Sequence, residues 1–159
     1  FPVYNMLYKF SSRAFISPVC RMKLKEKMYS VNENEVLFLY ADIRAISGIS
    51  RKSVTKLNLE MNKLAERLIE KHIVLIVLPS PDKYDLYYEY IIDNNYPKNQ
   101  LFDYLREQDS KYVFIDTKEM LLAEIKSGER DVYYADDSHW SPKASRVIAE
   151  KIIDLTHKR

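Results

Sequence analysis

The sequence predicts an α/β fold in which helices cover both faces of a mainly parallel sheet. Apolar, β-branched runs alternate along the chain with segments that have helical spacing. Strand, helix and strand in that order form a parallel βαβ unit, and the crossover helices of such units cover the sheet. The 159 residues suffice for a substantial core, and no linker or repeat divides them. We therefore predict a single domain over residues 1–159.

Residues 1–35 are the least regular part of the sequence and predict loops with one or two short helices. Residues 36–40 form a continuous apolar run, which predicts a buried strand. From Ser53 onward the spacing predicts a helix, with a buried face made of Leu57, Met61, Leu64 and Leu68. The apolar run over residues 73–78 predicts a central parallel strand that is buried on both faces.

The remaining segments continue the alternation. A strand is predicted over residues 112–116, and helices over residues 83–92, 100–108 and 117–126. Asp116 or Thr117 can cap the last of these helices. Ser141 as N-cap and Pro142 as first helical residue begin the final helix, whose buried stripe is Ile148, Ile152 and Leu155.

The composition excludes several classes of function. The net charge is +2 and no long basic run occurs, so nothing in the sequence favours binding of nucleic acid. One cysteine and three histidines argue against a zinc site and a metal site of several histidines. Two glycines are too few for a P-loop or a dinucleotide-binding fingerprint, and no cofactor is predicted.

Two further observations concern the surroundings of the protein. No apolar run reaches the roughly 18 residues that a membrane-spanning helix needs, so we expect no integral membrane segment. A signal peptide is not recognisable either. The 13 tyrosines allow two interpretations, namely packing within the core and surface or a surface that binds sugars.

The segment before the last helix has the pattern most typical of catalysis. Asp137 and His139 stand two positions apart, so both side chains point to the same side of an extended segment. A carboxylate on one ring nitrogen fixes the tautomer, and the other nitrogen can then take a proton from a nucleophile. Asp136 is the alternative partner. Ligands bind past the C-terminal ends of parallel strands, where residues 41–42, 79–83 and 135–139 are expected.

Two segments carry a resemblance to a known family. Residues 133–143, with Asp137-Ser138-His139-Trp140, resemble the Asp-Thr-His-Trp motif of alginate O-acetyltransferase-like proteins in the SGNH (GDSL-like) hydrolase superfamily. Residues 78–87 resemble the Pro-x-Pro-Asp-Lys-Tyr segment that follows a central strand in that family. The similarity covers residues 54–155. It implies a three-layer α/β/α fold, SGNH- or flavodoxin-like, or an incomplete piece of one.

The resemblance also implies a function. This is acetyl transfer, or acetyl-ester hydrolysis, on a cell-surface or exported polysaccharide by a serine nucleophile, without cofactor or metal. The expected location is extracytoplasmic, in the periplasm or at the cell surface. His139 is then the general base and Asp137 the orienting acid, although the Asp-x-x-His spacing of the wider superfamily names Asp136. Residues expected to contact substrate are Lys83, Tyr84 and Trp140.

The sequence departs from the family at the nucleophile. The Gly-Asp/Thr-Ser segment that should carry it does not occur, and Ser47, Ser50 and Ser80 lack that context. The nucleophile then lies outside these 159 residues, which the start at Phe1 favours, or the chain has become a non-catalytic carbohydrate-binding or assembly module. A third interpretation is a plain α/β interaction domain in which the motif is coincidental.

Overall fold

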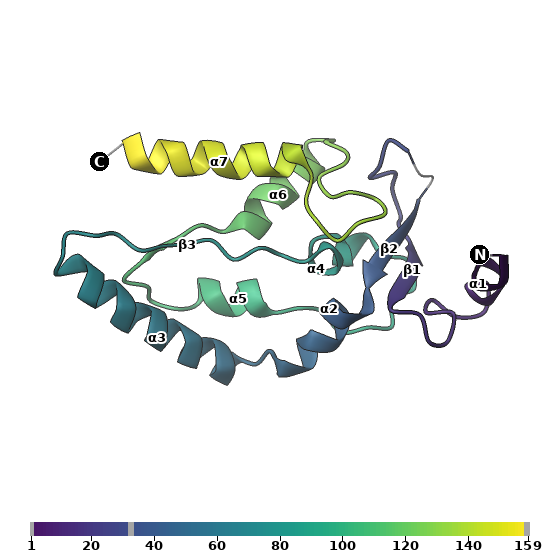
Figure 1. Ribbon diagram of the computed structural model, residues 1–159, viewed down its shortest axis with the longest axis horizontal. Coiled ribbons are helices and arrows are strands. Elements are labelled where there is room, and N and C mark those ends of the chain that lie inside the picture. The colour runs from purple at the N-terminus through teal and green to yellow at the C-terminus, as the bar shows by residue number, and fades with distance from the viewer. Residues whose placement is uncertain (1, 32–33, 158–159) are drawn as a thin grey trace.

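The computed structural model describes residues 2–31 and 34–157. A β-hairpin and the N-terminal helix lie at one end of an elongated molecule, and the C-terminal helix extends to the other end (Figure 1). In chain order the elements are α1 (Pro2–Leu7), β1 (Val19–Lys23), β2 (Glu35–Leu39), α2 (Tyr40–Ala45), η1 (Ile46–Gly48), α3 (Arg51–Ile69), β3 (Ile76–Val77), α4 (Lys83–Tyr87), η2 (Tyr88–Tyr90), α5 (Leu101–Arg106), β4 (Val113–Phe114), α6 (Thr117–Lys126) and α7 (Pro142–His157).

The N-terminal part is more regular than predicted, because β1 pairs with β2. The two strands are antiparallel, with Val19 opposite Leu39 and Lys23 opposite Glu35. The predicted strand at residues 36–40 is confirmed as β2. In β1 only Cys20 and Met22 face the core, and an alternation with two core positions is too short to predict a strand from the sequence.

The predicted mainly parallel sheet is reduced to one short parallel pair in the described residues. β3 pairs with β4 only through Ile76 with Val113 and Val77 with Phe114. Helices do lie on both sides of this pair, α6 and α7 on one side and α3 and α5 on the other (Figure 1). The strand predicted over residues 73–78 is not buried on both faces, since its middle residues 75–77 are only half-buried. β4 is its one hydrogen-bonded neighbour in the described chain. Ile73, Val74 and Leu78 are exposed.

The predicted helix from Ser53 is confirmed as α3, but the face predicted to be buried is only partly so, because Met61 and Leu68 are half-buried and the other two leucines are exposed. Leu57 and Leu64 are each 48% exposed, whereas Val54, Asn58 and Ala65 are buried. Asn58 fixes this orientation, because its amide donates to the carbonyl of Asp109 at 3.1 Å and accepts from the Tyr112 hydroxyl at 2.8 Å. A polar contact with the segment between α5 and β4 thus sets the helix rotation.

The helix caps predicted at Asp116 and Ser141 are confirmed. Asp116 Oδ1 accepts from the backbone N–H of Glu119 at 2.9 Å and caps α6, which leads at its other end into Gly128 with φ of +96°. Ser141 Oγ accepts from the N–H of Lys143 at 3.2 Å at the start of α7. None of the helices in the described residues is long and apolar enough to span a membrane.

The core is mainly aliphatic, with aromatic side chains from β2, α4 and the segment before α7 packed into it. Phe38 of β2 meets Tyr84 of α4 edge to face, with ring centroids 5.9 Å apart. The structure thus uses many of the tyrosines for packing, since five of them are buried, namely Tyr29, Tyr84, Tyr87, Tyr112 and Tyr133.

A buried ion pair joins α4 to α6. Lys118 Nζ donates to Asp85 Oδ1 at 2.6 Å, and the two side chains are 8% and 1% exposed. Burial raises the pKa of Asp85 to about 6, although the nearby ammonium of Lys118 acts in the opposite direction. Each buried charge depends on the other for compensation, so removal of one partner leaves the other charge buried and unpaired.

Replacing Lys118 by Met is expected to lower the free energy of unfolding by about 3–5 kcal/mol, because Asp85 is left buried without its partner. The double variant Asp85→Leu/Lys118→Met removes both charges and is expected to recover most of that loss. Urea unfolding followed by circular dichroism measures both effects. A double variant as unstable as the single one would show that the pair itself stabilises the fold.

Candidate active site

A cleft of about 290 Å³ opens where three separate segments meet. Leu39 and Asp42 line it from the junction of β2 and α2, and residues 80–82 line it from the turn before α4. Tyr133 and residues 138–140 complete it from the segment before α7. Each segment overlaps or borders one of the three stretches expected past the strand ends. The structure therefore brings together residues that are up to about a hundred positions apart in sequence.

The motif residues belong to a closed loop, residues 132–141, which we call the motif loop. Tyr133 and Trp140 form an antiparallel bridge across its base. The N–H of Tyr134 donates to the carbonyl of His139 at 3.2 Å, and the N–H of Ser141 donates to the carbonyl of Val132 at 2.9 Å. These bonds place His139 directly beside the paired base of the loop.

Asp137 and His139 are in direct contact, as their spacing predicts. Asp137 Oδ1 lies 2.7 Å from Nδ1 of His139 and also accepts the backbone N–H of His139 at 3.2 Å. The bond to His139 lowers the pKa of Asp137, so the carboxylate accepts and Nδ1 carries the proton. The side chain of His139 is 79% exposed, which leaves Nε2 as the ring nitrogen that can take a proton. The structure pairs His139 with Asp137 and records no bond from His139 to Asp136.

Two carboxyl groups that the sequence did not assign line the same cleft. Burial raises the pKa of Asp42, and the nearby Asp82 adds to this effect. Asp82 caps α4 by accepting the N–H of Asp85 at 2.7 Å, and burial also raises its pKa. The proximity of Asp82 to Asp42 and His139 depends on the fold, because the three residues come from separate segments of the chain.

Lys83 and Tyr84, predicted to contact substrate, are buried in this structure. Lys83 is 2% exposed, and its Nζ donates to the carbonyls of Tyr134 and Ala135 at 2.9 and 3.0 Å. Tyr84 is 0% exposed, and its hydroxyl donates to the carbonyl of Pro97 at 3.0 Å. Both side chains are committed to protein contacts, and their contact with substrate stays a prediction.

Trp140 is partly buried, lines the cleft and packs against the core. Of the serines considered as nucleophile, Ser80 lines the cleft, together with Ser138 of the motif loop. Ser50 instead caps α3, and Ser47 donates to the carbonyl of Arg44 at 3.0 Å. No group of three acidic, histidine or cysteine side chains suited to a metal ion occurs among the described residues.

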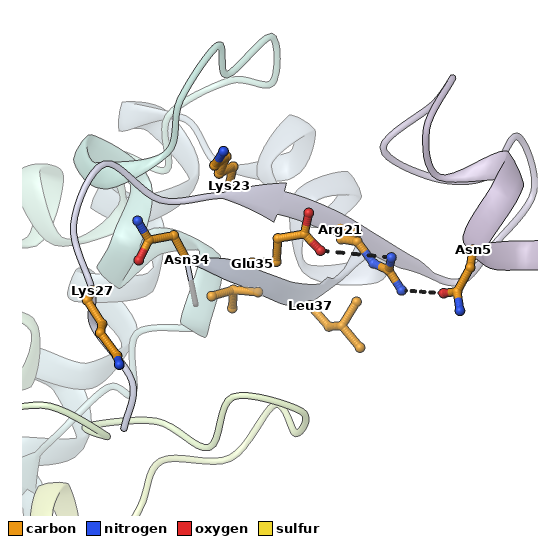
Figure 2. Close-up of a pocket in the computed structure, with 8 residues that line it drawn as sticks. Asn5, Arg21, Lys23, Lys27, Asn34, Glu35 and Leu37 are labelled. Carbon is orange, nitrogen blue, oxygen red and sulfur yellow. Dashed lines mark hydrogen bonds and ion pairs between the residues drawn. The ribbon is translucent and has the colours of Figure 1, made fainter. Parts of the chain in front are cut away.

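A second depression, of about 750 Å³, lies over the outward face of the hairpin (Figure 2). Arg21 reaches between Asn5 and Glu35 there, donating to Asn5 at 2.9 Å and lying 3.9 Å from the carboxylate of Glu35. Lys23 and Lys27 point to different sides of it (Figure 2). None of the predicted site residues is among the described residues that line this depression.

Comparison with known proteins agrees with the family resemblance stated from the sequence. A family model described as SGNH hydrolase-like domain, acetyltransferase AlgX, matches residues 34–159. No curated protein and no solved structure gives a significant match. The match covers most of the chain and includes all three segments of the cleft. The resemblance stated from the sequence is thereby confirmed, and the chain belongs to the family of SGNH hydrolase-like domains of AlgX-type acetyltransferases.

Proposed function

We propose that this chain supplies the histidine and carboxylate of a serine acyl-transfer site that acts on acetyl groups of a cell-surface or exported polysaccharide, outside the cytoplasm. The observation that carries the proposal is the 2.7 Å contact between Asp137 and His139 beside the cleft. Membership of an acetyltransferase family supports the same chemistry.

In the proposed reaction a serine hydroxyl attacks the acetyl carbonyl while Nε2 of His139 takes its proton. Asp137 holds the opposite side of the ring and stabilises the imidazolium that forms. The tetrahedral intermediate collapses, His139 returns the proton to the departing oxygen, and the acetyl group remains on the serine. A sugar hydroxyl or water then accepts the acetyl group by the same steps in reverse order. We propose that Trp140 offers its ring to the sugar at the cleft.

Ser80 and Ser138 line the cleft, but neither stands in the Gly-Asp/Thr-Ser segment of the family. This departure favours a second candidate function, a carbohydrate-binding or assembly module without catalysis. Release of acetate from an acetylated polysaccharide by the purified protein distinguishes the two, because a binding module retains the polysaccharide without releasing acetate.

Replacement of His139 by Ala is expected to lower acetyl-ester turnover by about 100- to 10,000-fold, because the general base is lost. The measurement is acetate release at saturating substrate. His157, an exposed residue at the end of α7, offers a matched control, and His157→Ala should retain wild-type turnover. Equal turnover in His139→Ala and wild type would refute the proposed role of His139.

The two candidate acids can be separated by amide substitutions of equal size. Asp137→Asn is expected to lower turnover by about 100- to 10,000-fold, because an amide does not stabilise the imidazolium and favours the wrong tautomer. Asp136→Asn is expected to cost much less, since Asp136 lacks a recorded bond to the ring. The reverse order of the two variants would assign the orienting role to Asp136.

A further inference from the structure

A buried lysine connects the motif loop to the rest of the domain. We propose that Lys83 is a positioning residue, whose ammonium group holds the backbone of the motif loop so that Asp137 and His139 keep their contact at the cleft. This inference rests on the proposed acyl-transfer function for its role in activity. Its structural part, the effect on the Asp137–His139 contact, can be tested without any reaction.

The contacts of Lys83 support this role directly. Its Nζ donates to the carbonyls of Tyr134 and Ala135, at 2.9 and 3.0 Å. These carbonyls stand just before Asp136 and Asp137 in the chain, so the bonds fix the backbone from which Asp137 projects. Hydrogen bonds from a charged donor are roughly twice as strong as neutral ones. Because Ala135 is only 6% exposed, water does not readily replace the ammonium there.

The other contacts of the motif loop do not replace this anchor. The bonds between Tyr134 and His139 and between Ser141 and Val132 close the loop on itself. Attachment to the α4 side comes from Lys83 and from the Tyr133 hydroxyl, which donates to the carbonyl of Pro81. The Tyr133 contact lies at the base of the loop. Lys83 instead contacts the backbone of residues 134–135, which leads to Asp137.

A lysine is a costly residue at this place. Burial lowers the pKa of Lys83 to about 8, while the carboxylates of Asp136 and Asp137 act in the opposite direction. Facing it from β2 is the ring of Phe38, with its centroid 5.8 Å from Nζ. Because its pKa of about 8 lies above 7, Lys83 is mostly charged at neutral pH. A methionine of similar length would fill the same space without the desolvation cost but would leave both carbonyls without this donor.

The test is the pair of variants Lys83→Met and Lys83→Arg. Lys83→Met is expected to lower kcat by about 10- to 100-fold with little change in KM, because misplacement of a catalytic group by about 1 Å has effects of this size. Lys83→Arg keeps a charged donor and is expected to recover part of kcat. Folding of each variant is checked by circular dichroism before kinetics.

A second readout does not depend on turnover. The ¹⁵N shifts of the His139 ring report which nitrogen carries the proton. We expect the Nδ1–H tautomer in the wild type, since Asp137 accepts that proton, and a shift toward the Nε2–H tautomer in Lys83→Met. The matched control is Asp85→Leu/Lys118→Met, which also removes a buried lysine, from α6, whose ammonium bonds to Asp85 of α4 rather than to the motif loop. This control is expected to retain both the wild-type tautomer and the wild-type kcat.

Two results would overturn the inference. One is a wild-type tautomer and kcat in folded Lys83→Met. The other is an equal loss in the control, which would reduce Lys83 to a general contributor to stability. If the wild type itself releases no acetate, the proposed function fails, and the tautomer of Lys83→Met still decides whether Lys83 positions the pair.

Discussion

The extended turn before α4 is the structural constraint on which the candidate site depends. Pro79 and Pro81 restrict the backbone there and disfavour helix at the residues before them, so their carbonyls remain available to side chains. The hydroxyl of Thr117 from α6 donates to Pro79, and the hydroxyl of Tyr133 donates to Pro81. The turn over residues 79–81 thus accepts hydrogen bonds from α6 and from the motif loop. The cleft exists because this segment is held between them.

The polar interactions of the core divide into two kinds. Lys118 and Asp85 compensate each other inside the fold, and apolar residues of suitable size could replace them. Lys83 instead compensates backbone carbonyls in the motif loop, where an apolar residue offers no donor. Charges buried at similar depth therefore have different consequences. The pair of Lys118 and Asp85 affects the packing between α4 and α6. Lys83 affects the shape of the motif loop, which carries the exposed side chains of Asp137 and His139.

Local features of the structure could be predicted from the sequence, and non-local ones could not. Asp116 and Ser141 were recognisable as caps because a cap depends on a few neighbouring residues. The contact of Asp137 with His139 follows from a spacing of two. In contrast, the rotation of α3 depends on Asn58 and its partners Asp109 and Tyr112, which are 51 and 54 positions away. Apolar periodicity contains no information about such polar contacts.

The same reason explains what was missed at the site and in the sheet. Lys83 finds its acceptors 51 and 52 positions away, so the sequence, which predicted a substrate contact for it, could not indicate these partners. Asp42 faces Asp82 only after β2 and the turn before α4 have come together. Strand runs predict extended backbone but not which edges pair, and β1 has too short an apolar alternation to be recognised.

The exposed run around β3 has a consequence for handling the protein. Residues 73–78 are six consecutive aliphatic residues without charge, glycine or proline, a composition that favours cross-β association. Ile73, Val74 and Leu78 are accessible, and an unpaired strand edge is a template for another chain. Lys71 before the run and Pro79 after it are the flanking residue types that oppose such growth. Self-association at high concentration would therefore begin at this segment, which ends two residues before Ser80 of the cleft.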